Sequence, residues 1–200
     1  MPPPLAAELP SAMPAPGSVV EAKSTHVTQA GIGSASPHGA SVVLTKTPDG
    51  YQVDGACAVR ATRATAWSVL TDYEGIDRFV PSMRVSRVLS RAPNHWLVEQ
   101  IASARVFVFG RTMRVVLEIH EQPPDSIRFE DIAREDFSSY RGLWRIEGRG
   151  TDTRVVYRVT VKPRFSVPDF ILRRALLTSI QSLLIDVGRE IERRAAATGG

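Results

Sequence analysis

The segment at residues 70–83, LTDYEGIDRFVPSM, holds a group of side chains that could do chemistry. Asp72, Glu74 and Asp77 fall close together there, beside the aromatic rings of Tyr73 and Phe79. Carboxylates with apolar walls can act as general acids and bases when burial shifts one of their pKa values. At helical spacing, however, the three acids do not converge on one point, so the segment does not predict a catalytic pair.

A structural interpretation of the same segment is more economical. Asp72 would sit between two short helices, where its carboxylate could cap the second helix. Glu74 would then lie in the first turn, where negative charge suits the helix dipole. We expect Tyr73, Phe79 and Pro81 to form a corner that closes one end of a cavity, and Pro81 to end the helical turn.

Side chains that commonly bind metals or act as nucleophiles are sparse. The four histidines are His26, His38, His95 and His120, and none of them shows ligand spacing such as H-x-x-x-H. The single cysteine, Cys57, excludes an internal disulfide and is expected to pack as a small apolar side chain. No G-x-S-x-G motif occurs. The sequence therefore predicts no metal site, no cofactor and no nucleophilic residue.

Acid–base chemistry on the expected strands stays open as an alternative. Polar side chains with that potential are Glu99, Gln100, Arg105, Glu130, Asp131 and Arg134. A buried carboxylate among them could be tuned for catalysis, but charges on a solvated strand face are the commoner explanation. We therefore expect no catalytic residue and lean towards a protein that is not an enzyme.

The elements that must position these side chains follow from turn signals and hydrophobic periodicity. Eight short runs with β-like composition are separated by Gly, Pro, Asn and Asp turns, with no long helix between the last six. The expected strands are 41–46, 52–59, 83–90, 95–109, 112–121, 126–135, 139–147 and 153–162. A short helix is expected at 62–70, with Thr62 as its N-cap, and a helical turn at about 74–79. This order favours an antiparallel meander.

One long amphipathic helix, from Pro168 to about residue 196, follows the strands. Strands such as 153–162 alternate between an apolar and a basic face, so the sheet has one dry face that needs a cover. The terminal helix is the only long element that could provide it. The chain is thus expected to be α+β, with a curved sheet wrapped around that helix. Such a sheet encloses more volume than one helix fills, which predicts an internal apolar cavity.

The same residues carry a family resemblance over about residues 50–195. The segment A-W-S-V-L-T-D-Y-E, then Phe79-Val-Pro81, Gly142-Leu-Trp144 and the long terminal helix together resemble the START-like (SRPBCC) superfamily. Within it, the chain is most similar to the bacterial polyketide cyclase/dehydrase group, which includes coenzyme Q-binding relatives. The resemblance implies a helix-grip fold with a deep apolar cavity. It implies a ligand such as a lipid, quinone or polyketide, and for some members a protein or ribosome partner.

Aromatic and long apolar residues are the expected cavity walls, with Gln100 and two tyrosine hydroxyls as polar anchors. On 95–109, the parity that contains Trp96, Val98 and Gln100 is assigned to the inside. The candidate lining is Trp67, Tyr73, Phe79, Pro81, Trp96, Gln100, Met113, Tyr140, Trp144, Tyr157, Leu176, Ile180 and Leu184. The alternatives to non-catalytic binding or transport are a cyclase/dehydrase-type enzyme and an interaction module.

That interaction module would use the outer sheet face. If the last two strands pair, five basic side chains lie together there, namely Arg141, Arg145, Arg154, Arg158 and Lys162. A basic face can meet phosphates or an acidic partner, but a solvated face balanced by nearby acids is the favoured interpretation. No DNA partner is expected, and we expect a monomer.

Composition sets the remaining bounds. Hydrophobic residues make up 43% of the 200-residue chain, which is typical of one globular domain. Residues 1–40 are rich in Pro, Ala, Gly and Ser and are expected to be a disordered tail before a domain at 41–197. No apolar run is long enough to span a membrane. The compartment is left open: we favour the cytoplasm, whereas a leader missing from this sequence would indicate export.

Overall fold

The computed structural model describes residues 39–104 and 111–198. The expected tail at 1–40 therefore lies, except for its last two residues, outside the described residues, as does the part of the expected strand 95–109 that follows residue 104. The elements are β1 (Ser41–Thr47), β2 (Gly50–Arg60), α1 (Arg63–Leu70), a 3₁₀ turn η1 (Ile76–Arg78), β3 (Met83–Ala92), β4 (His95–Ala104), β5 (Arg111–Gln122), β6 (Ser126–Asp131), β7 (Phe137–Arg149), β8 (Asp152–Pro163) and α2 (Asp169–Thr198).

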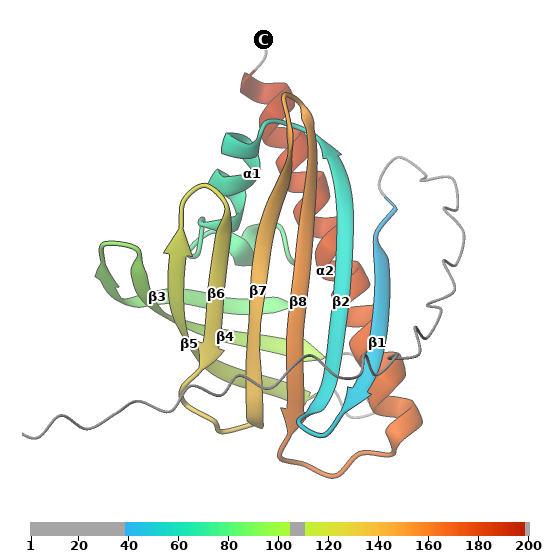
Figure 1. Cartoon of the computed structure of the whole chain (residues 1–200). Coiled ribbons are helices and arrows are strands. Elements are labelled where there is room, and N and C mark those ends of the chain that lie inside the picture. The colour runs from blue at the N-terminus through green and yellow to red at the C-terminus, as the bar shows by residue number, and fades with distance from the viewer. Residues whose placement is uncertain (1–38, 105–110, 199–200) are drawn as a thin grey trace, which may run out of the picture. The chain divides into compact units, whose positions relative to one another are not determined.

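All eight strands join one antiparallel sheet in the order β1-β2-β8-β7-β6-β5-β4-β3. The sheet curves so that β3, β4 and β5 run across the direction of β7, β8 and β2, and α2 lies behind the sheet on one side (Figure 1). The expected α+β architecture, a curved sheet gripping a long terminal helix, is confirmed. Within the described residues, no helix is long and apolar enough to cross a membrane.

The helix α2 is seated on β2 by a close approach at Gly55. A Cβ atom at Gly55 would lie 2.5 Å from Leu184 Cδ1, so the glycine leaves room for that leucine. Leu184 is fully buried, and Ile180, Val187 and Ile191 on the same helix face are buried with it. The expected apolar stripe of the terminal helix is thus the contact that holds the helix to the sheet.

β6 ends earlier than its composition predicts. The expected strand ran from 126 to 135, but β6 ends at Asp131. The buried Asp131 carboxylate accepts backbone N–H bonds from Val116 (3.0 Å), Ala133 (3.1 Å) and Arg134 (3.2 Å). Arg134 has a φ of 52°, a left-handed conformation that a strand cannot contain. A side chain that binds its own backbone therefore terminates the ladder.

The corner after α1 corrects the expectation for Asp72. Thr62 is the N-cap of α1, as expected, and its hydroxyl accepts the Thr65 N–H at 3.2 Å. The second helical turn is only η1, which has Gly75 as its N-cap and no side-chain cap. Asp72 instead accepts a hydrogen bond from Arg194 Nη2 at 2.6 Å. The capping expectation was wrong because a basic group more than 120 residues away competes successfully for the carboxylate.

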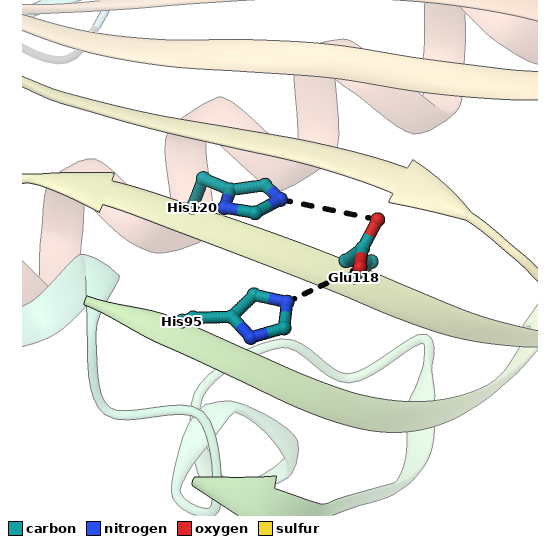
Figure 2. A group of neighbouring side chains, drawn as sticks. All are labelled: His95, Glu118 and His120. Carbon is teal, nitrogen blue, oxygen red and sulfur yellow. Dashed lines mark hydrogen bonds and ion pairs between the residues drawn. The ribbon is translucent and has the colours of Figure 1, made fainter. Parts of the chain in front are cut away.

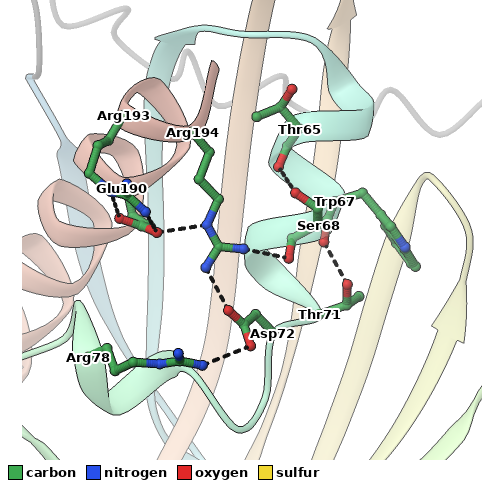
Figure 3. A network of polar contacts seen from close by, with 9 residues as sticks. All are labelled: Thr65, Trp67, Ser68, Thr71, Asp72, Arg78, Glu190, Arg193 and Arg194. Carbon is green, nitrogen blue, oxygen red and sulfur yellow. Dashed lines mark hydrogen bonds and ion pairs between the residues drawn. The ribbon is translucent and has the colours of Figure 1, made fainter. Parts of the chain in front are cut away.

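The end of α2 is tied to this corner by a polar network (Figure 3). Glu190 accepts hydrogen bonds from both Arg193 (2.7 Å) and Arg194 (2.7 Å). Arg194 extends across to Asp72, and its guanidinium lies over the Phe79 ring at 5.8 Å. A hollow of about 760 Å³ borders the network between α1, η1 and α2. Polar contacts thus close the end of the domain where the corner was expected.

The network predicts a pH-dependent part of the stability. The hydrogen bonds from Arg193 and then Arg194 lower the pKa of Glu190 from 4.5 to about 2. A carboxyl group with a lowered folded pKa contributes stability above its unfolded pKa, and that stability is lost as the pH falls from about 4.5 to about 2. Because Arg193 is solvent-exposed, we expect a contribution of about 1–2 kcal/mol rather than the full value of the shift.

Urea unfolding of the wild type and of Glu190→Gln between neutral pH and pH 3 measures this contribution. The variant should be less stable at neutral pH, and the difference between the two proteins should shrink on acidification. Glu74→Gln, at an exposed position of the same corner, is the matched control. An equal stability difference between wild type and Glu190→Gln at every pH would contradict the assignment.

Candidate functional site

The inner face of β6, β7 and β8 forms a band of aromatic rings. The alternation of these strands turns Phe129, Tyr140, Trp144 and Tyr157 to the same side. Ring centroids are separated by 4.2 Å for Trp144 and Tyr157, 5.8 Å for Phe129 and Tyr140, and 5.9 Å for Phe129 and Tyr157. Phe137 continues the band, 5.1 Å from Tyr140. The sheet thereby presents a continuous apolar surface towards the interior.

A glycine lets this band pack closely. Gly142 is the cross-strand partner of Phe129, and a Cβ atom at Gly142 would clash with the Phe129 ring and with the Arg158 carbonyl oxygen. The aromatic ring therefore covers the glycine, as occurs where a strand glycine is protected by a neighbouring aromatic residue. This packing explains the sequence Gly142-Leu-Trp144. Gly142 leaves room for the Phe129 ring, and Trp144 packs against the Tyr157 ring.

The inner face continues on β4 as the alternation predicts. Val98 is fully buried, and Trp96 and Gln100 are half-buried. On the neighbouring strand β5, Met113 is the cross-strand partner of Ala102. The inward assignment of this parity is confirmed for Trp96, Val98, Gln100 and Ala102, and the positions from residue 104 on lie beyond the described side chains. Trp96 meets Tyr73 edge-on, with ring centroids 5.3 Å apart, and the Arg91 guanidinium lies 4.4 Å from its ring.

Trp96 carries an unused hydrogen-bond donor. Its indole Nε1 is buried and has no hydrogen-bond partner among the described residues. A buried N–H without an acceptor costs free energy, so such groups are uncommon in folded proteins. A donor of this kind can be satisfied by a water molecule or by an acceptor atom of a bound molecule.

Other polar groups at this end of the inner face are already paired. The Ser86 hydroxyl donates to the Tyr73 carbonyl oxygen at 2.6 Å, and Gln100 Nε2 donates to Ser86 Oγ at 3.3 Å. Tyr73 donates its hydroxyl to Glu121 Oε1 at 2.7 Å. Tyr73 is therefore an anchor of the corner, as expected, and the Gln100 side-chain oxygen is the group left to accept a further hydrogen bond.

The expected acid–base candidates are committed to structural contacts. Asp131 is occupied by three backbone N–H groups, as described above. Glu99 lies on the outer face, is 3% exposed and is covered by Arg87 and Arg114, which hold its pKa below the usual range, Arg114 having the larger effect. Glu130 forms an exposed ion pair with Arg134 at 3.2 Å. Arg105 lies outside the described residues.

The remaining expected wall residues divide into three groups. Ile180 and Leu184 are buried in the helix–sheet contact, and Leu176 is half-buried beside it. Trp67 is half-buried on α1 and points away from the polar network (Figure 3). Pro81 is exposed in the turn after η1, and the buried residue there is its neighbour Val80.

Two aromatic members of the wall were missed in the sequence. Phe129 and Phe137 are buried at the centre and edge of the aromatic band. Alternation in Ser126–Asp131, where Ile127, Phe129 and Asp131 share one face, was the signal that could have located Phe129. Phe137 follows an irregular loop, so no local periodicity marks it.

The outer basic face is confirmed as an arrangement of exposed side chains. Arg141, Arg145, Arg154, Arg158 and Lys162 all lie on the solvent side of β7 and β8. Acidic partners neutralise several of them. Arg158 pairs with Asp54, Arg141 with Asp49 at 3.4 Å, and Arg145 with Glu147 at 3.9 Å. Two of these three acids, Asp54 on β2 and Asp49 in the turn before it, come from the neighbouring hairpin.

A curved antiparallel sheet around a terminal helix, with an aromatic inner face, defines the START-like helix-grip class of proteins. The family model for polyketide cyclase/dehydrase and lipid transport proteins matches residues 59–186, and the chain belongs to this family. No curated protein matches the chain.

Solved structures with this fold include proteins with different named activities. The Zhui aromatase/cyclase from Streptomyces sp. R1128 is 19% identical, with a TM-score of 0.65 over 74% of this chain and 98% of its own. A STAR-related lipid transfer protein from Xanthomonas axonopodis is 15% identical, with a TM-score of 0.64 over 79% of this chain and 96% of its own. Human StAR-related lipid transfer protein 5 is 9% identical, with a TM-score of 0.63 over 78% and 83%. These similarities concern the fold.

The tyrosine environments predict a titration behaviour. Burial raises the pKa of Tyr73, Tyr140 and Tyr157, and a hydrogen bond to Asp169 raises the pKa of Tyr51. These are all four tyrosines of the chain. A raised folded pKa makes a stabilising contribution that is present below the unfolded pKa of about 10 and is lost as the pH rises above it.

We therefore expect that the folded protein shows no tyrosinate absorption near pH 10. Tyrosinate absorption should appear only at higher pH, together with unfolding. Ultraviolet difference spectra and circular dichroism recorded in one alkaline titration provide the measurement. Tyrosinate that forms near pH 10 for two or more residues while the fold persists would contradict these environments.

Proposed function

We propose that the domain binds or transports a small hydrophobic molecule, of the lipid, quinone or polyketide class, between α2 and the inner face of β4, β5 and β7, without catalysis. The proposed lining comprises Trp96, Gln100, Met113, Tyr140, Trp144, Tyr157 and Leu176, with Tyr73 and Phe79 at the closed end. Membership of the family supports hydrophobic binding in general. The assignment of the site rests on one observation, which follows.

That observation is the accessible surface of side chains deep in the domain. Burial raises the pKa of Tyr140, yet Tyr140 is only half-buried by area, as are Trp96, Met113 and Trp144 on the same face. α2 packs against β1, β2 and α1. Aromatic and apolar side chains that keep accessible area on this face leave room for a ligand against them, which supports the proposal. The helix thus fills one side of the curved sheet, which supports a ligand space at the other side.

The polar groups in this region suit orientation of an uncharged molecule. The unpartnered Trp96 Nε1 can donate to a carbonyl or quinone oxygen, and the Gln100 oxygen can accept from a hydroxyl group. Tyr140 and Tyr157 stay neutral at physiological pH because their pKa values are raised, so they offer O–H groups rather than phenolates. A few polar anchors on a largely apolar wall are the usual composition of a small-molecule site.

The contacts of the nearby carboxylates support binding without catalysis. Asp131 accepts three backbone N–H bonds, and Glu121 accepts the Tyr73 hydroxyl. These contacts occupy carboxylate oxygens that a general base would use to accept a proton.

A bulky substitution on the inner face distinguishes an empty ligand space from a solidly packed core. Ala102 is half-buried on the inner face of β4, whereas its neighbour Ser103 faces outward and binds Arg84. Ala102→Trp should abolish uptake of a bound lipid or quinone and leave the folding stability nearly unchanged, since the ring enters the ligand space. Ser103→Trp, on the opposite face, is the matched control and should retain uptake.

Native mass spectrometry of the full chain with a panel of phospholipids, fatty acids and quinones measures uptake, and urea unfolding measures stability. If the region is instead solidly packed, Ala102→Trp should cost about 1–3 kcal/mol through overpacking. Such a loss, together with an unliganded wild type across the whole panel, would remove the proposal.

A cyclase/dehydrase-type enzyme is the second candidate. The phenol groups of Tyr140 and Tyr157, which stay neutral because their pKa values are raised, could protonate a substrate carbonyl oxygen. Incubation with a linear polyketide-like chain should then give a product lighter by one water molecule, and Tyr157→Phe should reduce its formation while binding persists. Binding without any mass change in the substrate favours the non-catalytic function.

A further inference from the structure

Three side chains of types that commonly bind metal ions lie together on the outer face of the sheet, opposite the proposed ligand space. His95 on β4 is the direct cross-strand partner of His120 on β5, and Glu118 precedes His120 by two residues on the same face. The strands alternate, so Trp96 and Ile119 face inward between them. Cross-strand partners have Cβ atoms about 4.5–5.5 Å apart, which brings the two imidazoles together without any sequence spacing typical of metal sites.

The side chains already point at one another (Figure 2). His95 Nε2 lies 3.2 Å from Glu118 Oε1, and His120 Nε2 lies 3.9 Å from Glu118 Oε2. The imidazole rings stack with centroids 4.6 Å apart and an angle of 19° between their planes. One nitrogen from each histidine and one carboxylate oxygen lie within 4.8 Å of one another.

We propose that His95, Glu118 and His120 form a surface site for a divalent transition-metal cation of the Zn²⁺ class. Two imidazole nitrogens and a carboxylate oxygen are a donor set that Zn²⁺ uses in sites with an open fourth position. Imidazole also suits Cu²⁺ and Ni²⁺, whereas Mg²⁺ and Ca²⁺ prefer oxygen ligands.

The geometry needs only a small adjustment to hold the ion. Ligand atoms about 2.0–2.2 Å from a common tetrahedral centre lie roughly 3.3–3.5 Å apart. The present atoms are within 4.8 Å, and all three side chains keep exposed area, so rotation about their side-chain bonds can close the remaining gap. The backbones beneath them are fixed by the β4–β5 ladder, and a bond from Glu121 N to the Asn94 carbonyl oxygen (2.9 Å) holds the turn before His95.

The charges around the site permit a cation. Glu118 supplies one negative charge, and the adjoining β6 places Glu130 opposite Glu118 and Arg128 opposite His120. Glu130 pairs with Arg134 at 3.2 Å, so Arg128 is the positive charge beside His120, and the Glu118 carboxylate offsets it. Solvent reaches all three ligands, and we therefore expect reversible binding with a water molecule completing the coordination.

Titration of the full chain with Zn²⁺ by calorimetry, and with Co²⁺ by visible absorption, tests the site. We expect one equivalent bound by the wild type, with a Co²⁺ spectrum typical of nitrogen and oxygen ligands. His95→Ala, His120→Ala and Glu118→Gln should each weaken binding by at least the roughly 10- to 100-fold that loss of a second-shell partner causes. Zn²⁺ should also raise the melting temperature of the wild type but not of His120→Ala.

The other two histidines provide the matched control. A His26→Ala/His38→Ala double variant removes both histidines of residues 1–38, which lie outside the described residues, and should bind as the wild type does. The ligand variants should keep the wild-type circular dichroism, since their side chains are partly solvated. Binding that survives in the His95→Ala/Glu118→Gln/His120→Ala variant, binding lost in the double variant, or no binding by the wild type would each overturn the proposal.

Discussion

The arrangement of the whole domain depends on how closely α2 approaches β2. Gly55 has no side chain, and Leu184 occupies the space that a Cβ atom would need. This contact draws the helix to one side of the curved sheet, where it also covers β1. The buried side chains of this helix face join those of β4, β5 and β8 in one hydrophobic core. The glycine–leucine contact therefore determines where the helix packs on the sheet.

Polar interactions complete this arrangement at the end of the domain. Arg194 on α2 bridges Glu190 and Asp72, and it covers the Phe79 ring. The helix is thus held by apolar packing along its length and by charges at its C-terminal end. The acidic segment that suggested catalysis serves this attachment, and its aromatic residues face the core: Tyr73 is buried against Trp96.

The two faces of the sheet are chemically distinct. The inner face gathers aromatic rings and a few neutral donors and acceptors, which suits an uncharged hydrophobic molecule. The outer face carries ion pairs and the His95–Glu118–His120 group, which suits water and cations. Strand alternation separates most of the two sets, with the carboxylates of Asp131 and Glu121 as exceptions on the inner face, so changes on the outer face need not disturb the inner one. A metal ion bound outside would stiffen β4 and β5, which also present Trp96 and Met113 to the inside.

The sequence by itself determined the fold class, the eight strands, the terminal helix and the inward parity of β4, because hydrophobic periodicity and turn residues are local signals. It also identified three of the five rings in the aromatic band, since Tyr140, Trp144 and Tyr157 lie on clearly alternating strands. Tertiary structure alone decided that Arg194 binds Asp72, that β6 ends at Asp131 and that Pro81 is exposed. It also placed Arg87 and Arg114 over the Glu99 carboxylate. It also decided the meeting of His95 with Glu118 and His120. Each of these depends on strand register or on contacts between distant segments, and such pairings leave no periodic trace along the chain.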